Sequence, residues 1–295
     1  MTAQASPSVQ PATAVRWIQH CRLDGVWQMA IDAWLLEGQP ATEPAAAVLL
    51  APAFRLYRWS RPTLSLGWHQ RRLEPHWSDL ARQGRLALVR RPSGGRAVLH
   101  GGDLTYALVW PRPLGTRSEV YAQALGWLLE AFAAMGQPLR SGRQAASLQR
   151  SSCFATSTVA DLVHANGAKR VGSAQLWRGG HLLQHGSIQL DPCPALWREV
   201  FGGDPPELDP LPLGGHALED HLYRSAARWL GPLLGGSVGA VDLDHGGDGH
   251  AGHLPGLVPL GPEVLAAITQ HLGRFQPTLS VNGETSPELT MPRAT

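Results

Sequence analysis

The sequence contains one lysine, and it stands in a segment with a strand pattern. Of the 25 Lys and Arg residues only Lys169 is lysine, so the other 24 are arginine. A desolvated lysine can lose its proton at accessible pH whereas arginine cannot, so a site that moves a proton cannot exchange one for the other. Two interpretations of Lys169 follow: a proton-transferring amine, or an exposed strand residue without a chemical role.

Cys153, in RSSCFATS, is the cysteine whose setting best suits chemistry. A thiol attacks as its thiolate, so it needs a cation or a base nearby. The ammonium of Lys169 would stabilise the thiolate and a carbonyl oxygen, and the neutral amine would accept a proton from an incoming nucleophile. Such a pair predicts acyl transfer. The alternative is a small buried apolar residue, and Cys21 and Cys193 have no comparable setting.

The segment RRPSGGRAVLH, residues 90–100, is a second candidate. Its Pro-Ser-Gly-Gly turn between two strands presents successive backbone N–H groups, and Arg90 and Arg91 place positive charge beside them. This arrangement suits a carboxylate, a phosphate or a thioester carbonyl, and it also fits an ordinary hairpin turn. No Lys follows the glycines, so it is not a phosphate loop. His100 and His185 each follow apolar strand residues and fit structural roles equally well.

Composition excludes several classes of function. A net charge of +2 with scattered arginines argues against a nucleic-acid surface. No apolar run reaches the roughly 20 residues of a membrane span, and the first residues do not form a signal peptide. Three cysteines without a CxxC pair favour reduced thiols in the cytoplasm. No metal site is expected, because HExxH is absent and His245, His250 and His253 stand in a Gly-rich loop.

The elements that would position these residues follow from periodicity. Helices are predicted over 24–38, capped by Asp24, and over 118–136, capped by Ser118. Asn166-Gly167 predicts a type I′ turn, which places Lys169 on the second strand of an antiparallel meander. The remaining predicted strands cover 47–52, 54–60, 63–70, 86–91, 96–100, 104–111, 158–165, 168–177 and 181–190, and the remaining helices 74–84, 217–235 and 262–275.

Strands interleaved with helices predict an α+β fold, with a largely antiparallel mixed sheet flanked by helices. We expect a disordered lead over 1–12, a single catalytic domain over 13–276 with a Gly/His-rich loop at 235–255, and a flexible tail over 277–295.

Four stretches together resemble a known family: RRPSGGRAVLHGGDLTYALV, CFATSTVADLV, GAKRVGSAQ and LQHGSIQL. They are similar to the lipoate–protein ligase A and octanoyltransferase superfamily, which shares its catalytic fold with biotin protein ligases. QMAIDAWLLE and FRLYRWSRPTLSLGWHQ match the family's opening helix and strands, so the resemblance covers residues 16–191. Arg96 after the two glycines, and the position of Cys153, resemble the octanoyltransferase branch of Gram-positive bacteria.

The resemblance implies a role for each candidate. Cys153 would carry the acyl group and Lys169 would be its partner. The implied pocket residues are Arg90, Arg91, Ser93, Gly94, Gly95, His100, Ser173, Gln175, His185 and Gly186. One position departs from the family, which has Asp directly after His100 where this chain has Gly101-Gly102 before Asp103.

The implied reaction moves an octanoyl group from octanoyl-acyl carrier protein through a Cys153 thioester to a lysine of an apo lipoyl domain. That domain would belong to a glycine cleavage H protein or a dehydrogenase E2 subunit. No cofactor is implied, because the thioester is already activated. Two alternatives stay open: an ATP- and Mg-dependent lipoate–protein ligase, and a non-catalytic protein that binds acyl carriers or lipoyl domains.

Overall fold

A computed structural model describes residues 14–37, 50–142, 161–235 and 257–277 of the chain. The elements are β1 (Arg16–Leu23), α1 (Gly25–Glu37), β2 (Ala53–Trp59), β3 (Thr63–Leu66), α2 (Pro75–Arg82), β4 (Ala87–Arg90), β5 (Val98–His100), β6 (Asp103–Trp110), α3 (Arg117–Ala134), β7 (Arg140–Ser141), β8 (Asp161–Val163), β9 (Lys169–Arg178), β10 (His181–Gln189), α4 (Pro194–Phe201), α5 (Gly215–Leu233), α6 (Pro262–Thr269) and the 3₁₀ helix η2 (Leu272–Phe275).

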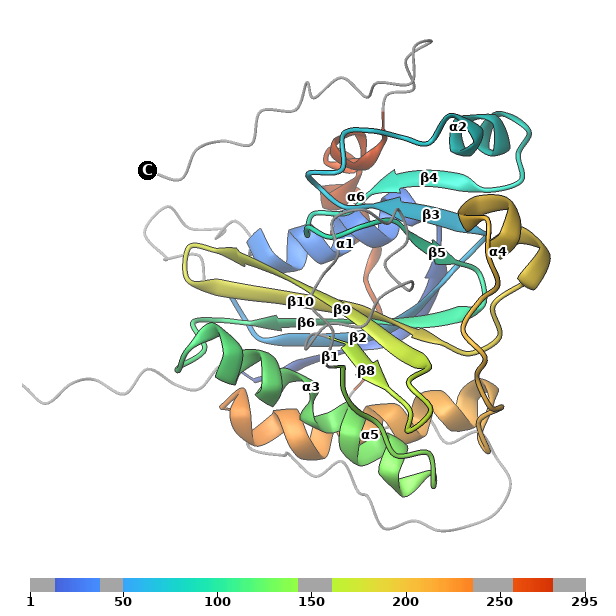
Figure 1. Cartoon of the computed structure of the whole chain (residues 1–295). Helices are drawn as coiled ribbons and strands as arrows, with labels where there is room; N and C mark the ends of the chain where they lie inside the picture. Colours follow the sequence, from blue (N-terminus) through green and yellow to red (C-terminus); the bar gives the residue numbers. More distant parts are fainter. Residues whose placement is uncertain (1–13, 38–49, 143–160, 236–256, 278–295) are drawn as a thin grey trace, which may run out of the picture.

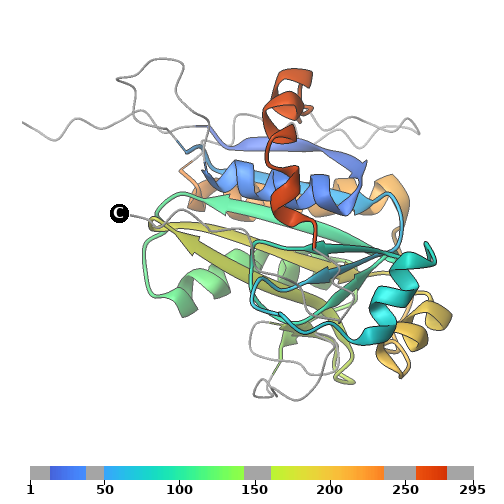
Figure 2. The ribbon, with the colours of Figure 1, turned by 90° about the horizontal axis from the view of Figure 1, so that it is seen from above.

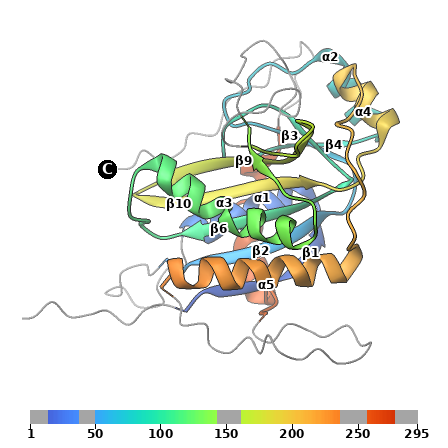
Figure 3. The ribbon, with the colours of Figure 1, turned by 60° about the horizontal axis from the view of Figure 1, so that its bottom comes forward.

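Two sheets organise the described residues. The large sheet has the order β1-β2-β6-β10-β9-β8-β7, and a smaller one has the order β4-β3-β5. Helices α3 and α5 cover one face of the large sheet (Figures 1 and 3). Helix α1, α6 and the small sheet lie over the opposite face, as the view from above shows (Figure 2). The site lies between the large sheet and this second layer.

Strand alternation assigns the side chains of the large sheet to two cores. Phe54, Leu56, Tyr106 and Leu108 face α3 and α5 in the first core. Neighbouring residues of the same strands, such as Tyr57 and Ala107, pack with α1 in the second. The cavity-facing side of the central strands therefore consists of the residues that alternate with the first core.

The predicted α+β fold with a largely antiparallel mixed sheet is confirmed, and the structure adds a second, smaller sheet. Parallel pairs occur at β1–β2 and at β3–β4, because each of these pairs is connected through a helix. The prediction missed β1, where Cys21 lies, and α4, which begins at Pro194. Neither of these short segments has a long enough periodic pattern to be recognised alone.

Several predicted ends were displaced. The N-cap of α3 is Thr116 rather than Ser118, because Thr116 and Glu119 form a reciprocal capping box. The helix ends at Ala134, two residues before Gly136. The single helix predicted over 262–275 is α6 followed by the separate turn of η2.

The type I′ turn predicted at Asn166-Gly167 is wrong. A type I′ turn needs positive φ at both residues, but only Gly167 has it, at 85°. The loop contains three residues, 165–167, closed by the His164 N–H donating to the Ala168 carbonyl at 2.9 Å. The Asn166 side chain instead accepts from the Ala168 N–H at 2.9 Å. The hydrogen bond to the Asn166 side chain shapes this loop in place of a type I′ turn. Lys169 still lies on the second strand of the meander, as predicted.

Among the described residues no helix is both long and apolar enough to cross a membrane. In those same ranges no cluster of three or more His, Cys, Asp or Glu side chains is placed to hold a metal ion. The predicted lead, all but the first residue of the Gly/His-rich loop with His245, His250 and His253, and all but the first residue of the tail lie outside the described residues.

Candidate active site

A row of paired residues crosses the large sheet on its cavity-facing side. Tyr57 of β2 pairs with Thr105 of β6, which pairs with Ser187 of β10. Ser187 pairs with Gly172 of β9, and Gly172 pairs with Asp161 of β8. Because directly paired residues lie on the same face, these five positions form one line perpendicular to the strands.

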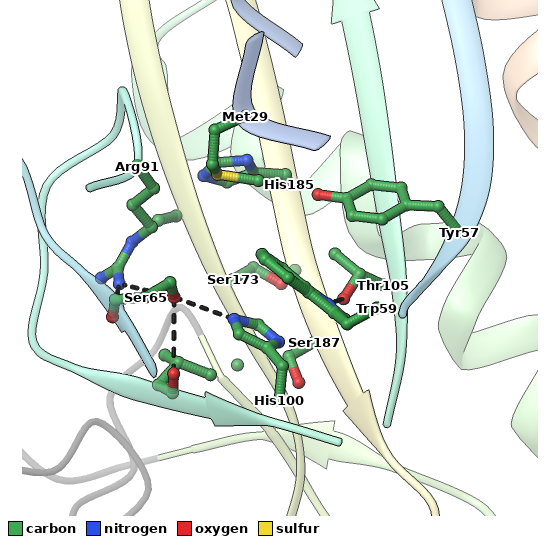
Figure 4. Close-up of a pocket in the computed structure, with 14 residues that line it drawn as sticks. Met29, Tyr57, Trp59, Ser65, Arg91, His100, Thr105, Ser173, His185 and Ser187 are labelled. Carbon is green, nitrogen blue, oxygen red and sulfur yellow. Dashed lines mark hydrogen bonds between the residues drawn. The ribbon is translucent and has the colours of Figure 1, made fainter. Parts of the chain in front are cut away.

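The cavity of the site follows this line. It contains about 390 Å³ of space not filled by protein atoms, and part of that space opens to solvent. Figure 4 shows its labelled side chains converging from the large sheet, α1 and the small sheet. It is lined by Met29, Tyr57, Trp59, Ser65, Arg91, Val98, His100, Thr105, Gly172, Ser173, Ala174, His185, Gly186 and Ser187.

Lys169 is held at the β8 end of this row. Its ammonium lies 2.9 Å from Asp161 Oδ1, and the two side chains are 3% and 5% exposed. Leu162 pairs with Val171 but Val163 pairs with Lys169, so β9 carries one extra residue at this point. This bulge turns Lys169 to the face of Asp161 and Gly172, the face that holds the cavity. A regular strand would have directed the amine into the α3 core.

Asp32 of α1 forms the first of two buried carboxylate hubs. Its Oδ1 accepts from Arg55 Nε and Nη2, at 2.9 and 2.5 Å. Its Oδ2 accepts from the Tyr57 hydroxyl at 3.1 Å and from His185 Nδ1 at 2.8 Å. Burial alone would raise the pKa of Asp32, but Arg55 and His185 outweigh burial and the pKa lies below its usual value. The carboxylate therefore stays charged and orients His185.

The Asp32 hub extends to the Pro-Ser-Gly-Gly turn. His185 Nδ1 lies 2.8 Å from Asp32 Oδ2, and its Nε2 lies 2.5 Å from the Ser93 hydroxyl oxygen. Asp32, His185 and Ser93 come from a helix, a strand and a loop that are far apart in the sequence, and all three are buried. This chain of hydrogen bonds connects His185, on the cavity wall, to the Pro-Ser-Gly-Gly turn predicted from the sequence.

Asp103 of β6 forms the second hub. It supplies a carboxylate beside His100 although Gly101 stands where the family has Asp. Its Oδ2 accepts from His100 Nδ1 at 2.7 Å, from Thr105 at 3.1 Å and from Ser187 at 2.6 Å. His100, Thr105 and Ser187 all line the cavity. Burial would raise the pKa of Asp103, but His100 and the other donors bring it below its usual value. The carboxylate two residues beyond Gly101 thus holds the histidine.

Arg90 and Arg91 support the turn from within. Arg90 Nη1 donates to the backbone carbonyls of Gly67 and Gln70, each at 2.9 Å. Arg91 Nη2 donates to the carbonyls of Gly94 and Arg96, at 2.8 and 2.7 Å. Buried carbonyls need donors, and these guanidinium groups supply them. Sequence reasoning had placed both charges towards a ligand, whereas in the structure they hold the loop, and Arg91 also lines the cavity.

The turn packs backbone against backbone at Gly67, which sequence reasoning had not singled out. A Cβ there would lie 1.8 Å from the Gly95 carbonyl oxygen, a distance that no side chain permits. Gly95 has φ 98° and Gly94 has open space around it. Two of the three glycines are therefore required by geometry.

Polar groups under the cavity floor face the α3 core. The Tyr106 hydroxyl lies 2.8 Å from Ser173 Oγ and accepts from Gln184 Nε2 at 3.0 Å. Gln175 donates in turn to Gln184 at 2.7 Å. Burial raises the pKa of Tyr106 to about 12, although the hydrogen bonds with Ser173 and Gln184 act to lower it. The phenol stays neutral, so this chain of bonds is a support.

The structure brings most of the predicted residues to one place. Arg91, His100, Ser173, His185 and Gly186 line the cavity. The others lie around it. Lys169 is paired with Asp161 at the end of the row, and Ser93 binds His185. Arg90 supports the turn that contains Gly94 and Gly95, and Gln175 lies beneath the cavity floor. Cys153 lies outside the described residues, so its role stays a prediction.

Sequence reasoning missed the residues that hold this site together. They are Asp32, Arg55, Tyr57, Trp59, Ser65 and Asp161. The sequence contained a signal for Asp32, because this carboxylate stands among the apolar residues of a helix that is mostly buried. For Asp161 the signal was its place in ADLV, directly before two apolar residues of the meander.

Comparison with known proteins shows the family to which this chain belongs. The model of the lipoyl protein ligase A/B catalytic domain matches residues 24–205. Octanoyltransferase LipM of Carboxydothermus hydrogenoformans is 39% identical over 182 residues, which cover 59% of this chain and 64% of that protein. For the enzyme of the same name from Moorella thermoacetica the identity is 35% over 189 residues, covering 61% and 66%. The chain matches less than two thirds of the length of these relatives.

Solved structures share the fold at low identity. A lipoate-protein ligase A bound with ATP has a TM-score of 0.63 at 14% identity, covering 89% of this chain and 95% of its own. A bipartite lipoate protein ligase of Thermoplasma acidophilum has a TM-score of 0.62 at 14% identity, with coverage of 89% and 93%. At these identities the likeness establishes the fold alone.

Proposed function

We propose that this chain, which belongs to the lipoyl protein ligase A/B catalytic domain family, transfers an octanoyl group from octanoyl-acyl carrier protein to a lysine of a lipoyl domain. Relatives that are 32–39% identical and bear the name octanoyltransferase support this reading. The structural observation that carries it is Lys169, a buried ammonium paired with Asp161 at the end of the row whose other four members line the cavity.

The sequence supplies a nucleophile on the same segment. Cys153 precedes Asp161 by eight residues, so a short stretch of sequence separates the proposed nucleophile from the carboxylate that binds Lys169. In the first step the Cys153 thiolate attacks the thioester carbonyl of the carrier. A bond from Sγ to the acyl carbon forms, the bond to the carrier sulfur breaks, and the carrier leaves as a thiol after taking a proton from the Lys169 ammonium.

In the second step the ε-amine of the lipoyl-domain lysine attacks the acyl-enzyme. The new C–N bond replaces the C–S bond, Cys153 leaves as a thiolate, and the amine loses a proton. Lys169 stabilises the oxyanion of each tetrahedral intermediate and, once deprotonated, accepts the amine's proton. The reaction needs no ATP, because a thioester is already activated.

The cavity suits an aliphatic chain. Each buried CH₂ contributes about 0.8 kcal/mol, so every missing methylene lowers acceptance roughly fourfold. His185 and His100 stand on the cavity wall with both nitrogens of each ring already bonded, to Asp32 and Ser93 and to Asp103 and Ser65. A wall whose polar groups are satisfied internally offers an acyl chain a mostly apolar surface.

The proposal is tested by mass spectrometry after incubation with octanoyl-acyl carrier protein. We expect the mass of one octanoyl group on the protein, absent from Cys153→Ser, and its transfer to an apo lipoyl domain without ATP. Pyrophosphate release from ATP and free lipoate, with Cys153→Ser still active, would replace the proposal by the ligase alternative. Binding of the carrier without any acyl transfer would indicate a non-catalytic protein.

A further inference from the structure

Two aromatic side chains close the end of the cavity that lies farthest from Lys169. Of the paired residues that line the cavity, Tyr57 is the farthest along the row from Gly172, and Trp59 stands two positions further along the same strand, on the same face. Their ring centroids are 6.0 Å apart at an interplanar angle of 52°. Both line the cavity, and Figure 4 shows the indole against His100 and Thr105.

This aromatic wall is fixed by its contacts. Trp59 Nε1 donates to Thr105 Oγ1 at 2.9 Å, and its ring stacks on His100 with centroids 3.9 Å apart and an angle of 20°. Both partners are themselves held by the Asp103 hub. The indole therefore cannot swing aside to lengthen the cavity without breaking bonds of the buried network.

The neighbouring ring is fixed as firmly. The Tyr57 hydroxyl donates to Asp32 Oδ2 at 3.1 Å, and the guanidinium of Arg55 lies 4.0 Å from the ring centroid. Burial and the charge of Asp32 raise the pKa of Tyr57 well above its usual value, so the hydroxyl remains a donor. The end of the cavity is thus built from two aromatic rings that are each anchored through a polar group.

The length between the two ends suits a medium chain. From Gly172 to Tyr57 the row crosses three strand intervals, about 14 Å at the usual strand spacing. The seven C–C bonds of an octanoyl group, at about 1.5 Å each in a zigzag, span roughly 9 Å.

We propose that Trp59, with Tyr57 beside it, sets the upper limit of acyl chain length. An acyl group whose carbonyl lies beside Gly172 and Lys169 runs across β9, β10 and β6, and its terminal methyl meets the indole. Longer saturated chains are excluded because the anchored wall does not yield. This inference rests on the proposed function and adds to it the substrate property that the site selects.

The experiment compares octanoyl-, decanoyl- and dodecanoyl-acyl carrier protein as donors for the wild type and for Trp59→Leu. Two more buried methylenes correspond to a gain of about fifteenfold, so the ratio of decanoyl to octanoyl kcat/KM should rise by at least that factor. Trp110→Leu is the matched control, because Trp110 is a buried tryptophan on the opposite face of the same sheet. Its ratio should equal that of the wild type.

Trp59→Phe provides a second, milder variant that keeps a ring to stack on His100. It should shift the ratio in the same direction by a smaller factor. Calorimetric binding of free octanoate and decanoate gives a readout independent of turnover. If the wild type transfers no acyl group, the proposed function fails, while the binding ratio still tests the length limit. An unchanged decanoyl to octanoyl ratio in the folded Trp59 variants, in both measurements, would overturn the inference.

Discussion

The ammonium of Lys169 and the carboxylate of Asp161 form a buried ion pair with an N–O distance of 2.9 Å. A β-bulge places the pair on the cavity-facing side of the sheet, in line with Gly172. The only lysine of the chain is therefore neither exposed nor directed into the α3 core. Of the two sequence interpretations of Lys169, the exposed strand residue is excluded.

Lys169→Arg tests whether the amine moves a proton. The substitution keeps the positive charge but removes a group that can deprotonate, so turnover should fall by a factor of at least about 100 while the fold persists. Steady-state octanoyl transfer and thermal unfolding measure the two quantities. Arg178→Lys is the matched exchange at a peripheral ion pair with Glu37 and should retain wild-type turnover. Near-normal turnover of Lys169→Arg would leave the lysine a structural role.

A double-mutant cycle tests the coupling within the buried ion pair. Asp161→Asn leaves the Lys169 ammonium without its carboxylate and should lower the free energy of unfolding by about 3–5 kcal/mol. Adding Lys169→Met removes the uncompensated charge, so the double variant should be more stable than the sum of the single effects predicts. Urea unfolding provides the values. Asp79→Asn, which breaks the exposed pair with Arg82, should cost less than about 1 kcal/mol. Additive effects at Asp161 and Lys169 would contradict a direct interaction.

The Asp32 hub predicts a dependence of stability on acid pH. Burial raises the pKa of Asp32, but Arg55 and His185 together lower it by more, so the pKa in the folded protein lies below its ordinary value. The carboxylate therefore contributes its full stability above the unfolded pKa of about 3.9, and this contribution is lost as pH falls through the folded pKa.

Asp32→Asn removes that contribution. The gap in unfolding free energy between wild type and variant should be constant from neutral pH to about pH 5 and should narrow below about pH 4. Chemical denaturation at a series of pH values measures it. A gap that keeps its full size at pH 3 and below would show that the charge of Asp32 is not what stabilises the hub.

Gly101→Asp tests whether the family's residue can be restored at this position. Gly101 has φ 136°, a conformation that side chains rarely adopt, and a Cβ would lie 3.2 Å from Pro62 Cα. With Asp103 already bonded to His100, the new carboxylate should cost about 1–3 kcal/mol and give no gain in turnover. Thermal unfolding and octanoyl transfer measure both effects. Gly101→Ala carries the same backbone strain without the charge and should lose similar stability, whereas a rise in Tm for Gly101→Asp would refute the assignment of Asp103.

Local patterns predicted much of the fold. The α1 helix, the β9–β10 hairpin and the α5 helix were all identified from the sequence. The pattern of α5 reflects a partly buried helix, whereas α1 and β10 are buried on nearly every residue and are marked by their apolar content. The turn at Asn166 was placed correctly but given the wrong geometry, since an Asx side-chain bond competes with the type I′ backbone. The start of α3 depended in the same way on a side chain, because Thr116 rather than Ser118 forms the capping box with Glu119.

The sequence by itself determined the residue types on which the proposed acyl transfer would depend, a solitary lysine and a cysteine before a meander, and it indicated the family through the motifs around them. Only the tertiary structure decided which residues meet. Tyr57, Thr105, Ser187, Gly172 and Asp161 lie in one row because five strands from distant parts of the chain pair in register. Strand register is set by the packing of whole faces, and no short stretch of sequence contains that information.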